Sequence, residues 1–340
     1  MNKNDFDSVM RKITAGLTGD ASKDVPYIMQ QAEAHKESEF AKEIARACGR
    51  LVFDILPDDK KSEFDRLFKN HSLGIAAVLD EAQFNMYRRK FEVAKKILTA
   101  AVEKVEALKM YQDDAVSEYH TFDSPIEEII YRHLHKPKKD LRQAPEPIAD
   151  LYLNLGSVLF ELEEFDTAEE VLKKAARWNP ITPNITFEHA EIFKKRGDMD
   201  TFYRMTTDVF PRAYTSKFVA RCFRNLGYYF VEKELWKVAA ACYLLSTHYE
   251  QNKQAQSELW YIQQKAGENF SLPTIAEIEA FAEEYNFPLA PDEDIVGIAI
   301  EFGRHAAQDG QTELAKYFLG IAYDLTKNET VKGWLDDLDA

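Results

Sequence analysis

The sequence predicts an all-α fold built from paired helices, and three observations support this prediction. Apolar residues recur at helical spacing, as in LYLNLGSVLFELEEFDTAEEVLKKAARWNP from Leu151 to Pro180. Small residues interrupt these helices at fixed offsets, and the same offsets return further along the chain. No stretch is rich enough in strand signals to predict a sheet.

The composition is that of an acidic protein with a large supply of core residues. The chain has 340 residues, 45% of them hydrophobic, and its 43 Lys and Arg against 58 Asp and Glu give a formal charge of -15. This is enough apolar surface for one substantial core or a series of small ones. The negative charge opposes binding to nucleic acid and to anionic membranes, so we expect neither as a partner.

Targeting and redox features are sparse. The opening residues MNKNDFDSVMRK lack the apolar core of a secretion signal, and apolar runs such as 238–245 are too short to span a bilayer. The three cysteines, Cys48, Cys222 and Cys242, include no Cys-x-x-Cys pair, so we expect buried thiols without a disulfide framework or a zinc site. These features predict a cytoplasmic protein.

The segment from Leu151 to Pro180 predicts two amphipathic helices joined by a tight turn. Gly156 lies inside the first helix, where glycine costs about 1 kcal/mol relative to alanine, so it needs a compensating reason. Close packing supplies one, because Gly156 and Ala168 let the two helices approach. Phe165 can fill the turn, and Pro180 prevents the second helix from continuing.

The residues at these offsets resemble the signature of the tetratricopeptide repeat (TPR) family, in the manner of its bacterial members. They are Tyr152, Leu155, Gly156, Leu159, Ala168, Leu172, Ala175 and Pro180. Further copies lie around Gly227 and Gly303, and a weaker copy lies around Ala82. The resemblance implies a right-handed α-solenoid of tandem helical hairpins.

The spacing between copies predicts hidden repeats. Ala82, Gly156, Gly227 and Gly303 lie 74, 71 and 76 residues apart, which leaves room for one degenerate unit in each interval, since a repeat has about 34 residues. We therefore expect seven helical pairs in a solenoid over 75–328, at 75–108, 109–148, 149–182, 183–219, 220–253, 254–295 and 296–328. Residues 1–74 predict an N-terminal segment of divergent hairpins with about four helices. Residues 329–340 predict a C-terminal capping helix that seals the solenoid.

The resemblance also implies a function, namely binding of a peptide or protein in the concave groove lined by the first helix of each pair. In this family the inward positions near Gly227 would be Arg221, Arg224, Asn225 and Tyr228. Asn154 occupies the same offset before Gly156 as Asn225 does before Gly227. An asparagine amide can pair with both the N–H and the C=O of an extended backbone, although either residue can equally be a solvated helix residue.

The arginines suggest the charge of the ligand. Five basic residues against one acidic residue give the range 201–225 a local charge of +4. Arginine forks onto carboxylates, so an acidic or carboxylate-bearing segment is one hypothesis. The alternative is that these arginines pair with acidic residues of neighbouring repeats.

Two other clusters of charged residues bear on function. The basic run RHLHKPKKDLR at 132–142 predicts a solvated connecting loop. The range 113–135 is dense in potential metal ligands, and these are Asp113, Asp114, Glu118, His120, Asp123, Glu127, Glu128, His133 and His135. His133 and His135 are two residues apart and face different sides of a helix, which disfavours a metal-dependent enzyme.

The sequence thus favours a non-catalytic scaffold without cofactors, since phosphate-binding loops, dinucleotide fingerprints and hydrolase motifs are absent. The alternative is a peptide-responsive regulator that acts through its N-terminal helices, and a metal-dependent enzyme comes last. The identity of the partner and the oligomeric state stay open.

Overall fold

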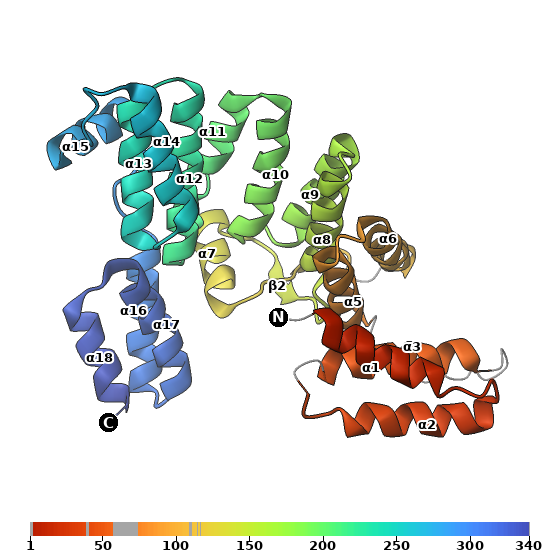
Figure 1. Ribbon diagram of the computed structural model, residues 1–340. Coiled ribbons are helices and arrows are strands. Elements are labelled where there is room, and N and C mark those ends of the chain that lie inside the picture. The colour runs from red at the N-terminus through yellow and green to blue at the C-terminus, as the bar shows by residue number, and fades with distance from the viewer. Residues whose placement is uncertain are drawn as a thin grey trace. The chain divides into compact units, whose positions relative to one another are not determined.

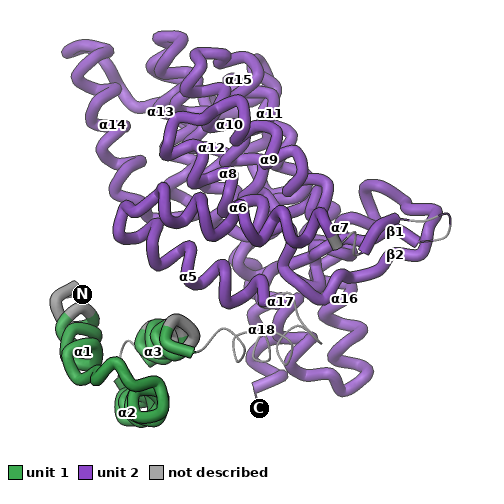
Figure 2. Tube along the Cα trace, turned by 90° about the vertical axis from the view of Figure 1, so that its right-hand side faces the viewer, with its two compact units in different colours: residues 1–73 green, residues 74–340 purple. Residues whose placement is uncertain are grey.

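Amphipathic helices form nearly all the regular structure of the chain. The computed structural model describes residues 3–38, 41–56, 74–108, 111–113, 115 and 117–339. It separates into two units, residues 1–73 and residues 74–340 (Figure 2). Each unit is described separately below.

The first unit contains three helices in its described residues, α1 (Lys3–Ala15), α2 (Ala21–Ala34) and α3 (Ala41–Ile55). Asp24 fixes the turn between α1 and α2, because its buried carboxylate accepts hydrogen bonds from the backbone N–H groups of Thr18 and Gly19, each at 2.8 Å. Four helices are expected in this segment, and the fourth would lie within residues 57–73, outside the described residues.

The second unit consists of helices paired along the chain (Figure 1). The pairs are α5 (Ile75–Tyr87) with α6 (Phe91–Leu108), α8 (Ile148–Glu161) with α9 (Phe165–Trp178), α10 (Pro183–Arg196) with α11 (Met199–Thr207), α12 (Ser216–Glu232) with α13 (Trp236–Tyr249), and α16 (Glu293–Gln308) with α17 (Thr312–Thr326). Helices α14 (Lys253–Ala266) and α15 (Ile275–Glu284) lie between the last two pairs, and α18 (Glu329–Asp339) packs on α17. The prediction of an all-α solenoid of tandem hairpins is confirmed.

A glycine brings the two helices of a hairpin together, as the sequence predicts. A Cβ atom on Gly156 would lie 2.6 Å from the side chain of Leu172 on the facing helix. The corresponding distances are 2.7 Å from Gly227 to Tyr243 and 2.7 Å from Gly303 to Leu319. These distances are shorter than any van der Waals contact, so the glycine allows the facing side chain to lie directly on the backbone of the first helix.

The turn of each of these hairpins carries one residue with positive φ, seven positions after the glycine. These residues are Glu163 (φ 61°), Glu234 (φ 58°) and Gly310 (φ 71°), and Arg89 (φ 55°) holds the same place after Ala82. The next residue then donates its backbone N–H to a carbonyl five residues earlier, as Leu235 does to Phe230 at 2.9 Å. Three turns therefore use a conformation that glycine adopts most easily without having glycine there.

The range 109–148 corrects two expectations. Instead of a helical pair it contains strand β1 (Ser117–His120), helix α7 (Pro125–His135) and strand β2 (Asp140–Gln143). The two strands pair in parallel, with Ser117 opposite Asp140. Parallel strands need a crossover connection, which α7 supplies. Part of the basic run 132–142, expected as a loop, is thus the end of α7 and most of β2.

A buried carboxylate attaches this β1–α7–β2 insert to the neighbouring repeats. Glu127 is fully buried and accepts hydrogen bonds from the Asp123 backbone N–H (2.7 Å), the Asn179 side-chain amide (2.9 Å) and the Tyr214 hydroxyl (2.7 Å). The Asn179 side-chain oxygen in turn accepts from the backbone N–H groups of Ile181 and Thr182, each at 3.1 Å. The Asn-Pro end of the repeat therefore positions the insert as well as ending a helix.

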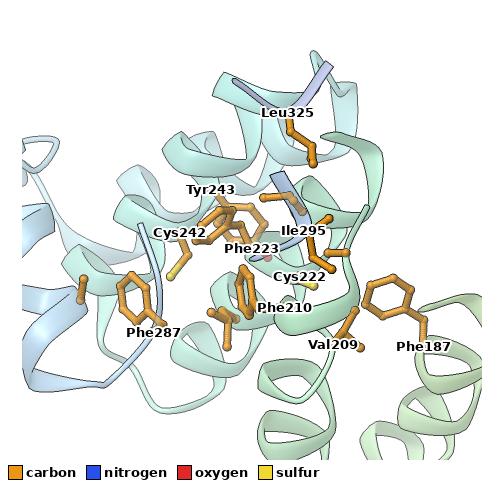
Figure 3. Packing of buried hydrophobic residues seen from close by; sticks show 14 of the residues in the cluster. Phe187, Val209, Phe210, Cys222, Phe223, Cys242, Tyr243, Phe287, Ile295 and Leu325 are labelled. Carbon is orange, nitrogen blue, oxygen red and sulfur yellow. The ribbon is translucent and has the colours of Figure 1, made fainter. Parts of the chain in front are cut away.

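The C-terminal hairpin packs against elements that come much earlier in the chain. Helix α16 contacts α7 and the short 3-10 helix η1 (Phe210–Arg212). At the start of α12, Ser216 donates its backbone N–H and its hydroxyl to the carboxylate of Asp324 at 2.8 and 3.0 Å. Ile295 and Leu325 thereby join Phe210 and Phe223 in one buried cluster (Figure 3). Cys222 and Cys242 are free and buried here, as expected.

The glycine contact predicts opposite effects for two substitutions in the same helix. Gly303→Ala should lower the free energy of unfolding by about 1–3 kcal/mol, because the new Cβ would overlap the Leu319 side chain. A Cβ atom on Gly297 in α16 would have no atom within 4 Å. Gly297→Ala should therefore raise the free energy of unfolding by about 0.5–1 kcal/mol. Urea unfolding followed by circular dichroism measures both, and a neutral Gly303→Ala would contradict the packing argument.

The turn geometry predicts a stabilising substitution. Glu234→Gly should raise the free energy of unfolding by roughly 0.5–1 kcal/mol, because glycine relieves the steric cost of positive φ. The matched control is Gly310→Ala, which should destabilise by a similar amount. Thermal unfolding by calorimetry compares the two variants, and a lower melting temperature for Glu234→Gly would refute the assignment.

Candidate partner-binding site

An open pocket lies between α12 and α14, the helices that precede and follow α13 in the chain. Its volume is about 930 Å³. Its lining comes from Tyr228, Val231 and Glu232 on α12 and from Lys253, Gln256, Ser257, Glu258, Trp260 and Tyr261 on α14. Of the five partner-contact residues predicted from the sequence, Tyr228 lines this pocket.

Helix α14 presents its aromatic side chains to this pocket because little of the helix is buried. Only Ala255 and Ile262 are buried in it, and the helix packs on α13. Trp260 is 64% exposed, an unusual state for so large an apolar side chain. Tyr261 makes an edge contact with Trp236 of α13, with ring centroids 6.5 Å apart.

The charges around the pocket are mostly negative. Glu232 and Glu258 line it, against Lys253. The pKa of the Tyr228 hydroxyl is raised, first by its partial burial and then by the nearby carboxylates of Glu232, Glu191 and Glu258. Neighbouring negative charge disfavours the phenolate, so the shift reports an acidic surrounding.

Arg221 and Arg224 both form ion pairs within the chain. Arg221 lies 3.3 Å from the Glu188 carboxylate of α10, and its guanidinium lies 4.5 Å from the centre of the Phe187 ring. Arg224 donates to Glu250 at 2.8 Å and to the Ser246 hydroxyl at 3.3 Å. Arg221 thus pairs with an acid of the neighbouring repeat, as the alternative hypothesis for the arginines states, whereas the partner of Arg224 follows α13 within its own hairpin.

The two asparagines have separate surroundings. Asn225 is buried and donates its amide to the Thr206 hydroxyl at 3.4 Å. Asn154 donates to the Asp150 carbonyl at 2.8 Å within its own helix, and its oxygen accepts from Gln83 of α5 at 3.4 Å. The five predicted residues therefore do not form one site, and only Tyr228 lines the pocket.

Sequence reasoning missed the contribution of α14. The segment QNKQAQSELWYIQQKAG lacks the glycine and alanine offsets of the repeat, so its residues could not be assigned to a face. One signal was available, because Trp260 and Tyr261 are adjacent and cannot both lie on the buried stripe of one helix.

The acid and histidine cluster of 113–135 is spread over several contacts. Glu127 is the buried carboxylate described above, and Asp113 lies 2.5 Å from Arg177. Glu128 pairs with Arg132 at 2.7 Å, and His133 lies 3.2 Å from Asp294 on α16. In the part of the chain that the structure describes, which excludes Asp114, no three such side chains are grouped so that they could hold a metal ion.

His120 is buried against aromatic rings. Its ring lies 4.6 Å from that of Tyr131 and 5.4 Å from that of Phe122, and its burial lowers its pKa. As regards membranes, no helix within the described ranges is both long enough and apolar enough to cross one.

Comparison with known proteins gives one family match. Residues 149–182 match the tetratricopeptide repeat family model. No curated protein sequence matches the chain. Among solved structures, the crystal structure of the APC/C hetero-tetramer Cut9-Hcn1 is similar at 11% sequence identity and a TM-score of 0.34. The alignment covers 94% of this chain and 60% of that chain, so this chain spans less than two thirds of the length of its match.

The matched segment is the hairpin of α8 and α9, with its contact between Gly156 and Leu172. The hairpins of α12 with α13 and of α16 with α17 repeat that contact and the positive φ seven residues later. Three hairpins of the chain therefore share the glycine contact and the turn geometry of the segment that matches the tetratricopeptide repeat family model.

Proposed function

We propose that this protein is a non-catalytic scaffold or adaptor that binds a segment of another protein in the pocket between α12 and α14. Tetratricopeptide repeats support a role in protein interaction, and the pocket supports this particular place on the solenoid. The observation that carries the proposal is Trp260, a residue that is 64% exposed and lines a cavity of about 930 Å³. Tryptophan is enriched among the residues that dominate binding energy at interfaces.

An acidic ligand would have to compete with the ion pairs that Arg221 and Arg224 already form. A carboxylate could bind Arg221 or Arg224 only in exchange for their contacts with Glu188 and Glu250. The Arg224 side chain is only 16% exposed, so an exchange there would also leave Glu250 without its partner. Within the proposal, Tyr228 is thus a direct contact, and the arginines become contacts only after their present ion pairs open.

The scaffold role predicts that Trp260→Ala weakens partner capture by about 30-fold, corresponding to about 2 kcal/mol for a central aromatic contact. Tyr87→Ala is the matched control, because Tyr87 is an aromatic residue on α5, 74% exposed and outside the pocket. Proteins captured from the native cell lysate are quantified by mass spectrometry for both variants. Capture that survives Trp260→Ala, or falls equally with Tyr87→Ala, would contradict the site.

The ion pairs predict how the arginines respond to an acidic probe. Glu188→Gln with Glu250→Gln releases both guanidinium groups, so affinity for a glutamate-rich peptide should rise by about tenfold over the wild type. Adding Arg221→Gln and Arg224→Gln should remove the gain. Isothermal titration with one amidated peptide measures all three proteins, and tight binding of the acidic peptide to the wild type would show that the arginines are accessible as they stand.

A further inference from the structure

We propose that the pocket between α12 and α14 selects a basic side chain, an arginine or lysine carried by the partner segment. This inference rests on the proposed function and names the chemistry of its ligand. It reverses the charge that the arginines of 201–225 suggest from the sequence. Three features of the pocket support it, namely an open aromatic face, a carboxylate without an ion-pair partner and the cations that the chain already places on neighbouring rings.

The aromatic residues of the pocket differ in what covers them. Lys194 lies with its ammonium 4.1 Å from the centre of the Tyr228 ring, and Lys265 lies 5.7 Å from that of Tyr261. Trp260 has no ring or cation contact with any residue that the structure describes, and its indole is the best cation-binding ring among the side chains. Cations of the chain thus lie on the rings of Tyr228 and Tyr261, and the Trp260 indole, which binds cations best, is left open.

Glu258 of the pocket differs from three other partly buried carboxylates of the second unit. Glu188, Glu250 and Glu277 each face a cation of the chain, at Arg221, Arg224 and Lys237 respectively. Glu258 is partly buried and has no ion-pair partner within the described ranges. A carboxylate held in a partly desolvated pocket gains most from a charged donor supplied by a ligand.

The balance of charge favours a cation over an anion. Two carboxylates, Glu232 and Glu258, line the pocket against one ammonium, that of Lys253. Lys253 is exposed and has a long side chain. Its ammonium group can therefore extend into solvent when a cation enters the pocket. An acidic side chain would instead approach two carboxylates, which repel it. The net charge of -15 adds a longer-range attraction for basic segments.

An arginine fits this arrangement with both the face and the N–H edge of its guanidinium group. Its planar guanidinium can stack on the Trp260 indole while its N–H groups donate to the carboxylate of Glu258 or Glu232. The aliphatic stem would then cover Val231 and the edge of Tyr228. A lysine reaches the same groups as a point charge without the planar fork, so arginine should bind more tightly than lysine.

The test uses three fluorescein-labelled, amidated peptides that share one alanine and glycine backbone and carry arginine, glutamine or glutamate at the same three positions. Fluorescence polarisation against the full chain at constant ionic strength gives each affinity. We expect the arginine peptide to bind at least about tenfold more tightly than the glutamine peptide, and the glutamate peptide to bind most weakly.

The pocket variant is Glu232→Gln with Glu258→Gln, which should abolish the preference for arginine. The control is Glu279→Gln with Glu301→Gln, which removes the same charge from exposed residues outside the pocket and should leave the preference intact. Trp260→Leu should weaken the arginine peptide by about tenfold while keeping an apolar side chain in place. Circular dichroism confirms that each variant is folded.

The outcomes separate this inference from the function on which it rests. Equal losses in the pocket and control variants would mean that only net charge matters, which overturns the inference. Tighter binding of the glutamine or glutamate peptide, with dependence on Trp260, would also overturn it and leave the scaffold function standing. If none of the peptides binds, the inference fails, and the capture experiment with Trp260→Ala then decides whether the scaffold function fails as well.

Discussion

The architecture depends on the close approach of two helices at a single glycine. At Gly156, Gly227 and Gly303 the facing side chain rests where a Cβ would otherwise be. This contact sets the distance between the helices of a hairpin, and hence the width of the unit that stacks on its neighbours. Where the contact is present, the hairpins have the same turn, with positive φ seven residues later. The regular part of the solenoid therefore follows from one repeated steric constraint.

The pocket occurs where one of its two helices lacks this constraint. Helix α14 has no glycine facing a partner helix, and only Ala255 and Ile262 are buried in it. Because its packing is confined to one narrow stripe, Trp260 and Tyr261 are left on the surface beside α12. The pocket and the irregular packing of α14 thus have a common physical origin.

Much of the fold could be predicted from the sequence because the repeat offsets encode close packing directly. Gly227 and Tyr243, for example, are sixteen residues apart in the sequence and in contact across the hairpin. The strands at Ser117–His120 and Asp140–Gln143 could not be predicted, since four residues carry too little periodicity and the pairing depends on α7 between them.

The candidate site was less predictable than the fold. Periodicity places Arg221 and Arg224 on one face of α12, but it does not show that Glu188 and Glu250 lie within reach of them. Those acids are 33 and 26 residues away, and only the stacking of helices brings them close. Tyr228 lines the pocket, and its position depends on its own helix alone, but its role as a contact stays a prediction.

The docking of α16 onto α7 and η1 changes how cooperatively this array of hairpins unfolds. In a simple solenoid each unit touches only its neighbours, so stability is a sum of local terms and unfolding can begin at either end. Here His133 meets Asp294 across 161 residues of chain, and Ser216 meets Asp324 across 108. Such long closures slow folding and join distant units into one cooperative block. A truncation that removes the last hairpin would therefore expose Phe210 and its neighbours in the middle of the array, and the damage would appear far from the cut.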